Sequence, residues 1–145
     1  MKKKIISWVK KQLKDSGAKG IVMGLSGGID SAAVAALVKE AIGKERLLAL
    51  ILPCHSQVQD LIDAQLVAKH LGIKTQTLDL SHIYDNLVRI LPEASSLAKA
   101  NLKPRLRMLV LYYFANKLNY LVCGTGNKSE LMVGYFTKQI GRAHV

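Results

Sequence analysis

The chain has 145 residues, half of them hydrophobic and 21% charged, a composition that suits one globular domain with a buried core. No apolar run is long enough to cross a bilayer, and the basic N-terminus lacks the apolar stretch and cleavage site of a signal peptide. The formal net charge of +11 favours a polyanionic partner, either nucleic acid or a phosphate-rich small molecule. The two cysteines, Cys54 and Cys123, have no metal-binding spacing, which predicts a reduced, cytoplasmic protein.

Helix-like and strand-like segments alternate along the chain. Residues 1–17 carry apolar residues on one side and lysines on the other, which predicts a surface helix that ends at Gly17. Strands are then predicted over 20–25, 46–53, 73–80 and 120–124, and helices over 30–43, 56–72, 81–91 and 104–119. Ser56 is a candidate N-cap, and Pro104 falls in a first helical turn, where proline is tolerated. This alternation predicts an α/β fold, a parallel sheet with helices on both faces.

Two glycine-containing loops leave the ends of predicted strands, where ligands of such sheets bind. They are "SGGIDS" (26–31) and "GTGNKSE" (124–130). In the first loop, Ser26, Ser31 and the glycines can present N–H and hydroxyl donors to phosphate oxygens, and the following helix adds the positive end of its dipole. The Gly-Lys of a Walker loop is absent. Because an ordinary strand–turn–helix junction uses similar residues, composition alone leaves both interpretations open.

Asp30, in the first loop, favours a site for phosphate and a metal ion. A carboxylate beside polyphosphate is repulsive unless a cation bridges the two, and Mg²⁺ held by one or two carboxylates plus phosphates is the usual arrangement. Glu130, in the second loop, is placed to supply another carboxylate. The alternative role of Asp30 is to compensate the positive end of the helix dipole.

Three stretches resemble a known family. "SGGIDS" resembles the PP-loop of the N-type ATP pyrophosphatases, which cleave ATP between its α- and β-phosphates. "LPEASSLAKANLKPRLRM" (91–108) and "GTGNKSELMVGYFTK" (124–138) resemble the ammonia-dependent NAD synthetases. This resemblance extends over residues 1–138 and implies the Rossmann-like fold of the adenine nucleotide alpha hydrolases.

The resemblance also implies an activity and its site residues. These synthetases are ligases that amidate deamido-NAD to NAD with ammonia, through an acyl adenylate, in the last step of NAD biosynthesis. The ATP site would comprise Gly24, Leu25, Ser26, Gly27, Gly28, Ile29, Asp30, Ser31 and Thr125. The resemblance further assigns Asp30 and Glu130 to catalysis and Mg²⁺ binding, and Arg105 and Lys138 to deamido-NAD. It implies a homodimer, with the apolar surface of helix 104–119 as a candidate interface, and no membrane or nucleic-acid partner.

Other residues near these motifs have more than one interpretation. Arg107 is expected to be structural or to support a neighbouring residue, whereas Arg105 is favoured for substrate binding over a role on the polar helix face. His55 follows the second predicted strand and is a weaker candidate for an adenine contact. Tyr112, Tyr113 and Phe114 are expected in the core or in a subunit interface.

The last residues, "QIGRAHV" (139–145), have no counterpart in the family. The peptide "IGRAHV" can be encoded by bases that match a common sequencing-library adapter. We therefore expect an NAD synthetase-like domain over 1–138 that is incomplete at its C-terminus, followed by a non-native tail. Such a chain would have weak or no catalytic activity. A divergent natural C-terminus is the alternative interpretation.

Two other functions are weighed against the synthetase. A PP-loop tRNA-modifying enzyme would suit the positive charge and the two cysteines, although these lack the paired spacing that would strengthen the case. A non-catalytic ATP-binding fragment is the third possibility.

Overall fold

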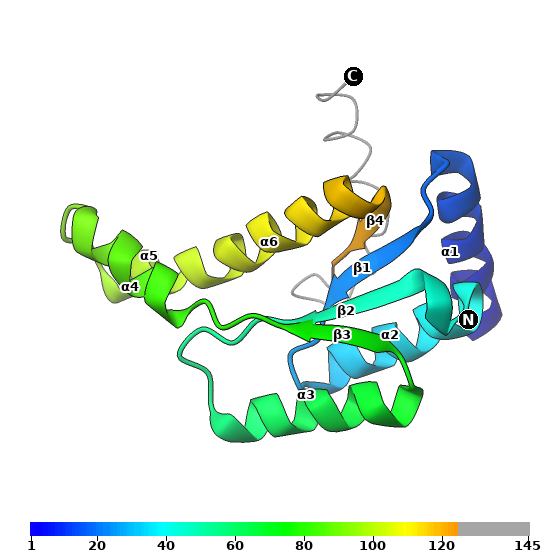
Figure 1. Cartoon of the computed structure of the whole chain (residues 1–145), viewed down its shortest axis with the longest axis horizontal. Coiled ribbons are helices and arrows are strands. Elements are labelled where there is room, and N and C mark those ends of the chain that lie inside the picture. The colour runs from blue at the N-terminus through cyan, green and yellow to red at the C-terminus, as the bar shows by residue number, and fades with distance from the viewer. Residues whose placement is uncertain (125–145) are drawn as a thin grey trace.

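A computed structural model describes residues 1–124 of the chain (Figure 1). The helices are α1 (Lys2–Ser16), α2 (Ile29–Ile42), α3 (Val58–Leu71), α4 (Ser81–Ile90), α5 (Ser96–Ala100) and α6 (Leu102–Leu118), with a 3-10 turn, η1 (Lys44–Arg46). The strands are β1 (Gly20–Gly24), β2 (Leu47–Ile51), β3 (Lys74–Thr77) and β4 (Tyr120–Cys123). The predicted helices and strands are all present at slightly different bounds, whereas η1 and α5 were not predicted.

The strands form one parallel sheet in the order β3-β2-β1-β4. The two central strands are β2 and β1, and Ile21 of β1 is in register with Leu47 of β2 on one side and with Leu121 of β4 on the other. The chain proceeds outward from β1 to β3 and then crosses back to place β4 on the far side of β1. The order of the strands therefore changes direction between β1 and β4, and crevices at such positions bind ligands. The predicted α/β fold is confirmed.

Alternate residues of each central strand point to opposite faces of the sheet, and both faces are covered. On β1, Ile21 and Met23 belong to a core that α1, α2 and α3 complete. Val22 points to the other side, into a core that includes Leu111 and Phe114 of α6. Figure 1 shows α6 on the side of the sheet opposite to α2 and α3. This double coverage explains why β1, β2 and β4 are made almost entirely of apolar residues.

The edge strand β3 is shorter than the strand predicted over 73–80. All four of its residues are exposed, which agrees with the expected place near an edge. The chain after it still follows the end of β2, because the N–H groups of Leu78 and Leu80 donate to the carbonyls of Ile51 and Pro53. These hydrogen bonds continue the path of the strand without a regular ladder.

The expected N-cap at Ser56 is wrong. Helix α3 begins at Val58, with Gln57 at the N-cap and no side-chain cap. The Ser56 hydroxyl oxygen instead accepts a hydrogen bond from the backbone N–H of Cys54 at 3.1 Å. Ser56 therefore shapes the connection between β2 and α3 rather than the start of the helix.

Helices α4 and α5 extend beyond the sheet, beside the N-terminal part of α6 (Figure 1). The Tyr84 hydroxyl of α4 donates to the carbonyl of Lys99 in α5 at 3.1 Å, which links these two helices. Large apolar side chains remain exposed here, among them Ile83, Ile90 and Leu97. No helix in residues 1–124 has the length and apolar character needed to span a membrane.

The two-sided core predicts different effects for two leucine truncations. Leu50 of β2 is completely buried, whereas the side chain of Leu66 on α3 is 59% exposed. We expect Leu50→Ala to lower the free energy of unfolding by about 2–5 kcal/mol, because it leaves a cavity in the core. The matched change Leu66→Ala should alter it by less than about 0.5 kcal/mol. Urea denaturation of both variants measures the difference, and equal losses would contradict the described packing.

Candidate functional site

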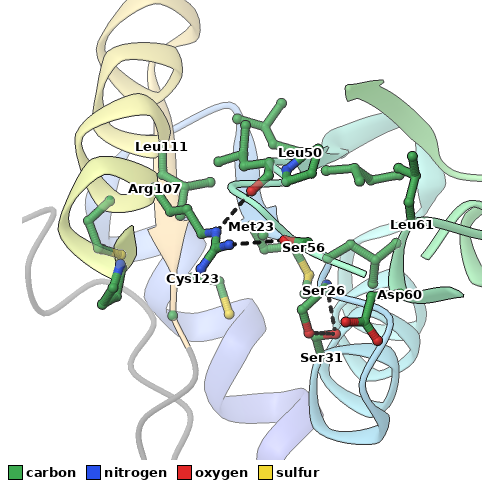
Figure 2. A pocket seen from close by; sticks show the side chains of 18 residues that line it. Met23, Ser26, Ser31, Leu50, Ser56, Asp60, Leu61, Arg107, Leu111 and Cys123 are labelled. Atoms are coloured by element: carbon green, nitrogen blue, oxygen red, sulfur yellow. Dashed lines mark hydrogen bonds between the residues drawn. The ribbon is translucent and has the colours of Figure 1, made fainter. Parts of the chain in front are cut away.

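A cavity of about 510 Å³ opens where β1, β2 and β4 end, between α6 and the start of α3 (Figure 2). Its lining residues are Met23, Gly24, Leu25, Ser26, Ser31, Leu50, Ile51, Leu52, Pro53, Ser56, Asp60, Leu61, Pro104, Arg107, Met108, Leu111, Cys123 and Gly124. Most of these residues are apolar. Among the lining residues within 1–124, Asp60 is the only acidic one and Arg107 the only basic one. The cavity is thus an apolar space with a few polar groups, as small-molecule sites usually are.

The serine hydroxyls hold the loop between β1 and α2 in shape. The Ser31 hydroxyl oxygen accepts from the backbone N–H of Ser26 at 3.2 Å and lies 3.1 Å from the Ser26 hydroxyl oxygen. The Ser31 hydroxyl also lies 3.2 Å from the carbonyl of Gly28, to which it donates. Figure 2 shows Ser26 and Ser31 side by side at one end of the cavity. Ser31 is itself buried, so this network belongs to the permanent structure of the loop.

The start of α2 offers backbone donors. Its N-cap is Gly28, which has no side chain to satisfy the first N–H groups of the helix. The next two residues, Ile29 and Asp30, are exposed. A helix N-terminus without a side-chain cap, beside two serine hydroxyls, is suited to bind an anion such as phosphate.

The loop comes very close to α3 at Gly27. This glycine has a φ of +87°, and a Cβ built on it would lie 2.3 Å from the carbonyl oxygen of Asp60. Glycine is therefore required at Gly27 both for its backbone conformation and for space. The close approach brings the carboxylate of Asp60, in the first turn of α3, to the serine end of the cavity, as Figure 2 shows. Among residues 1–124, no hydrogen bond or ion pair engages this carboxylate.

The predicted ATP residues fall into three groups. Gly24, Leu25, Ser26 and Ser31 line the cavity. Gly27, Gly28, Ile29 and Asp30 belong to the same loop and helix start but are not part of the cavity wall. Thr125 lies outside the described residues, as do Glu130 and Lys138. The structure thus brings together the first predicted loop, and the second one remains a prediction.

The two arginines of α6 have different surroundings. Arg107 lines the cavity, where its Nε donates to the carbonyl of Leu52 at 2.9 Å. Arg105 is exposed outside the cavity wall, and its Nη1 donates to the carbonyl of Asn101 in the preceding turn. Helical phase explains the difference: Arg107 is four residues before the buried Leu111, whereas Arg105 is four residues before the exposed Leu109.

Asp60 is a second cavity-lining residue that the sequence motifs did not single out, although the spacing of residues along α3 could have identified it. It precedes Ala64 and Ala68 by four and eight residues, and both alanines are buried against the sheet. Residues spaced four apart lie on the same face of a helix. A polar residue on the buried face of α3, in its first turn, therefore lies at the edge of the sheet, where the site is.

His55 does not reach the cavity wall. It has a φ of +52°, and its backbone N–H donates to the hydroxyl oxygen of Ser81 at 2.9 Å. Its ring lies beside α4, with Nε2 2.6 Å from Oδ1 of Asp85 and an edge-on contact to the ring of Tyr84. This placement gives no support to the weaker expectation of an adenine contact.

The aromatic residues of α6 divide as the helix turns. Phe114 is buried in the core, and Tyr113 is exposed on the outer face. Phe114 therefore agrees with the expectation of a place in the core.

Both cysteines are buried and free of disulfides. Burial raises the pKa of the Cys123 thiol to about 12 and raises that of Cys54 as well, against the opposing charge of Arg107. Neither thiol is therefore ionised near neutral pH. This disfavours sulfur transfer, which requires a thiolate.

Within residues 1–124, no three histidine, cysteine or acidic side chains gather as a protein-only metal site. Asp60 lines the serine end of the cavity, and Asp30 is in the first turn of α2, outside the cavity wall. This donor set fits a Mg²⁺ ion that takes one or two carboxylates and completes its coordination with phosphate oxygens and water.

Comparisons with known proteins lead to one family. A family model described as NAD synthase matches residues 1–141. The NH(3)-dependent NAD(+) synthetase of Carboxydothermus hydrogenoformans is 47% identical over 140 residues, which cover 93% of this chain and 57% of the relative. The solved NH3-dependent NAD synthetase from Campylobacter jejuni, in complex with the nitrate ion, has a TM-score of 0.82 at 34% identity, covering 88% of this chain and 56% of that one.

A third relative belongs to a larger type of enzyme. The glutamine-dependent NAD+ synthetase from Acinetobacter baumannii, in complex with ADP, has a TM-score of 0.80 at 30% identity and covers 94% of this chain but 26% of that one. The chain spans about half the length of the NH3-dependent relatives. None of the three proteins reported is a tRNA-modifying enzyme, so that alternative receives no support from them.

The contact between Gly27 and α3 predicts a strong effect of one methyl group. We expect Gly27→Ala to lower the melting temperature more than Gly72→Ala, because both glycines have positive φ but only Gly27 faces a backbone atom. Gly72→Ala should cost only the backbone strain of about 1–2 kcal/mol. Differential scanning calorimetry compares the two variants. Equal melting temperatures would show that the loop does not pack against Asp60 as described.

Proposed function

The chain belongs to the NAD synthase family, and from this premise we propose that the whole protein amidates deamido-NAD to NAD with ammonia and ATP. The observation that carries the proposal is the glycine and serine loop at the N-terminus of α2, which opens on the cavity where the strand order changes direction. The related synthetase from Acinetobacter baumannii is a complex with ADP, which supports an adenine nucleotide as the ligand of this cavity.

The proposed reaction has two steps. A carboxylate oxygen of the nicotinate ring attacks the α-phosphorus of ATP, a P–O bond forms, and the bond to the bridging oxygen breaks to release pyrophosphate. Ammonia then attacks the acyl carbon with its lone pair, a C–N bond forms, AMP leaves with its oxygen, and a proton is lost. The first step turns a poor leaving group into a good one. Positioning and charge neutralisation supply most of the acceleration of such transfers.

The loop residues serve the first step. Backbone N–H groups at the start of α2 and the hydroxyl of Ser26 hold phosphate oxygens, and the positive end of the helix dipole stabilises the departing pyrophosphate. The Ser31 network keeps these donors in place before the nucleotide arrives. Preorganised donors of this kind cost no rearrangement during the reaction.

Mg²⁺ is proposed at the same end of the cavity. Asp30 and Glu130 are the proposed ligands and would act as the catalytic carboxylates, with Asp30 at the start of α2. When bound, the ion supplies charge neutralisation for the phosphates. A carboxylate at this place would otherwise weaken the binding of a polyanion, which supports the assignment of Asp30.

Deamido-NAD is proposed to contact Arg105 and Lys138. Arg105 is exposed on the outer face of α6, beside Leu109 and Tyr113. It therefore suits an anionic substrate that approaches from outside the nucleotide cavity, where its guanidinium can pair with a phosphate or carboxylate.

A homodimer is proposed for the whole protein, with the outer face of α6 in the interface. Leu109 and Tyr113 are four residues apart and expose 67% and 63% of their surfaces. Large apolar side chains adjacent on a helix face are a common feature of subunit interfaces. Arg105 on the same face would then lie at the subunit boundary.

The protein is also proposed to be cytoplasmic. The two free, buried cysteines support this proposal, because reduced thiols are usual in that compartment.

The nucleotide proposal predicts an effect of magnesium that depends on Asp30. We expect the 145-residue chain to bind ATP more tightly with Mg²⁺ than without it. Asp30→Asn should weaken binding of the magnesium complex about tenfold or more, and should leave or improve binding of free ATP, because a repulsive charge is lost. Isothermal titration calorimetry measures both affinities, with Asp15→Asn on α1 as the matched control.

Activity is tested on the whole protein. NAD, AMP and pyrophosphate should form in equal amounts and only when deamido-NAD, ammonia and ATP are all present. ATP cleavage at the same rate with and without deamido-NAD would overturn the proposed substrate. Activity of Asp30→Asn with an unchanged dependence on Mg²⁺ would overturn the proposed metal ligand.

The dimer proposal predicts a change in mass. In the whole protein, Leu109→Glu should convert a dimer to a monomer, because a carboxylate cannot be buried in an apolar interface without a large cost. Light scattering after size-exclusion chromatography gives the mass. Leu66→Glu, the same substitution at an exposed leucine of α3 on the other side of the sheet, should remain dimeric. A Leu109→Glu protein that stays dimeric would place the interface elsewhere.

A further inference from the structure

Arg107 joins α6 to the connection between β2 and α3. Its Nε donates to the carbonyl of Leu52 at 2.9 Å, and its Nη2 lies 3.5 Å from the hydroxyl oxygen of Ser56. That oxygen also accepts from the backbone N–H of Cys54 at 3.1 Å. One side chain from α6 therefore holds both ends of the segment from Leu52 to Ser56, which forms part of the cavity wall.

The same segment is held from the other side by α4 and the residue before it. The N–H of Leu80 donates to the carbonyl of Pro53 at 2.7 Å, and the N–H of His55 donates to the hydroxyl oxygen of Ser81. These bonds fix the middle of the segment on the side away from the cavity. On the cavity side, among residues 1–124, the side chain from another element that bonds to the segment is that of Arg107.

The cavity has two polar ends with different chemistry. Ser26, Ser31 and the start of α2 lie at one end, and Arg107 enters from α6 across the cavity from them (Figure 2). Phosphates bind where several N–H and hydroxyl donors meet. A nucleotide with its phosphates on the serine loop must then direct its nucleoside toward the end that Arg107 forms, past the apolar walls of β1 and β2.

We propose that Arg107 is a positioning residue for the nucleoside part of ATP. It sets the wall from Leu52 to Ser56 against which the nucleoside lies, and it is not a ligand of the phosphates. This inference deepens the proposed function and rests on it. The two hydrogen bonds use part of the five N–H donors of the guanidinium. A partly buried guanidinium costs free energy that packing alone does not offset, which supports a role beyond filling space on α6.

The test compares two ligands of the 145-residue chain, Mg-ATP and magnesium tripolyphosphate, which has the phosphates but no nucleoside. Arg107→Met keeps the length of the side chain and removes its donors. We expect it to weaken ATP binding about ten- to one-hundredfold, the effect of losing charged hydrogen bonds, and to leave tripolyphosphate binding unchanged. Arg107→Lys, which can reach one acceptor, should lie between the two. Lys117→Met, on the exposed side of α6, should match the wild type.

A second variant keeps the test decisive if Arg107→Met does not fold. Ser56→Ala leaves the charge in place and removes the weaker contact, so we expect a loss of a few fold in ATP affinity and none for tripolyphosphate. In a folded Arg107→Met background, Ser56→Ala should add little, because both changes act on the same wall.

The outcomes separate this inference from the function on which it rests. Equal losses of affinity for ATP and tripolyphosphate would make Arg107 a phosphate ligand and overturn the inference. Unchanged ATP affinity in both Arg107→Met and Ser56→Ala would also overturn it. So would a double variant in which the two losses of ATP affinity add fully. A wild-type chain that binds tripolyphosphate but not ATP would overturn the nucleotide proposal and this inference with it.

Discussion

Parallel pairing of β1 with β2 on one side and β4 on the other is the constraint on which the site depends. Strands that run in the same direction end at the same edge of a sheet, so residues from distant parts of the chain meet there. The serine loop follows β1, the segment from Leu52 follows β2, and Cys123 with Gly124 ends β4. Because the core on both faces fixes these strands, it also fixes the cavity between them.

Which residues of α3 and α6 reach the site depends on which face of each helix is buried against the sheet. Asp60 and Arg107 reach the cavity because each continues the buried stripe of its helix beyond the edge of the sheet. The same stripe packs the helix on the sheet. Changes in the core would therefore move these two side chains, and the binding end of the molecule cannot be separated from the packing that supports it.

Sequence patterns were sufficient for the fold and for the first loop. Apolar strands alternating with helices at regular spacing predicted the parallel sheet, and "SGGIDS" predicted the loop before α2 that lies at one end of the cavity. The patterns failed where tertiary contacts decide. Ser56 has the composition of an N-cap, but a backbone N–H and a guanidinium compete for its hydroxyl.

The position of Arg107 on the cavity wall depends on tertiary contacts in the same way. The motif favoured Arg105, and the outward direction of that residue can only be known once the buried face of the helix is fixed by Leu111 and Phe114. Counting helical phase from these apolar residues would have directed Arg107 to the cavity. The loop from 124 to 130 stays a prediction, because all but its first residue lie outside the described part of the chain.

The order of the strands has a consequence for how the chain matures. β1, β2 and β3 follow one another with single helices between them, so their contacts can form while the chain is being synthesised. β4 pairs with β1 across the longest sequence separation of the strand pairs described, and closing that loop has the largest entropic cost. The edge of β1 that pairs with β4 therefore remains unpaired until β4 has left the ribosome. During that interval α2 and its serine loop already have their neighbours from β2 and α3, whereas the wall that α6 supplies is not yet there. The phosphate end of the cavity would therefore form before the end at Arg107.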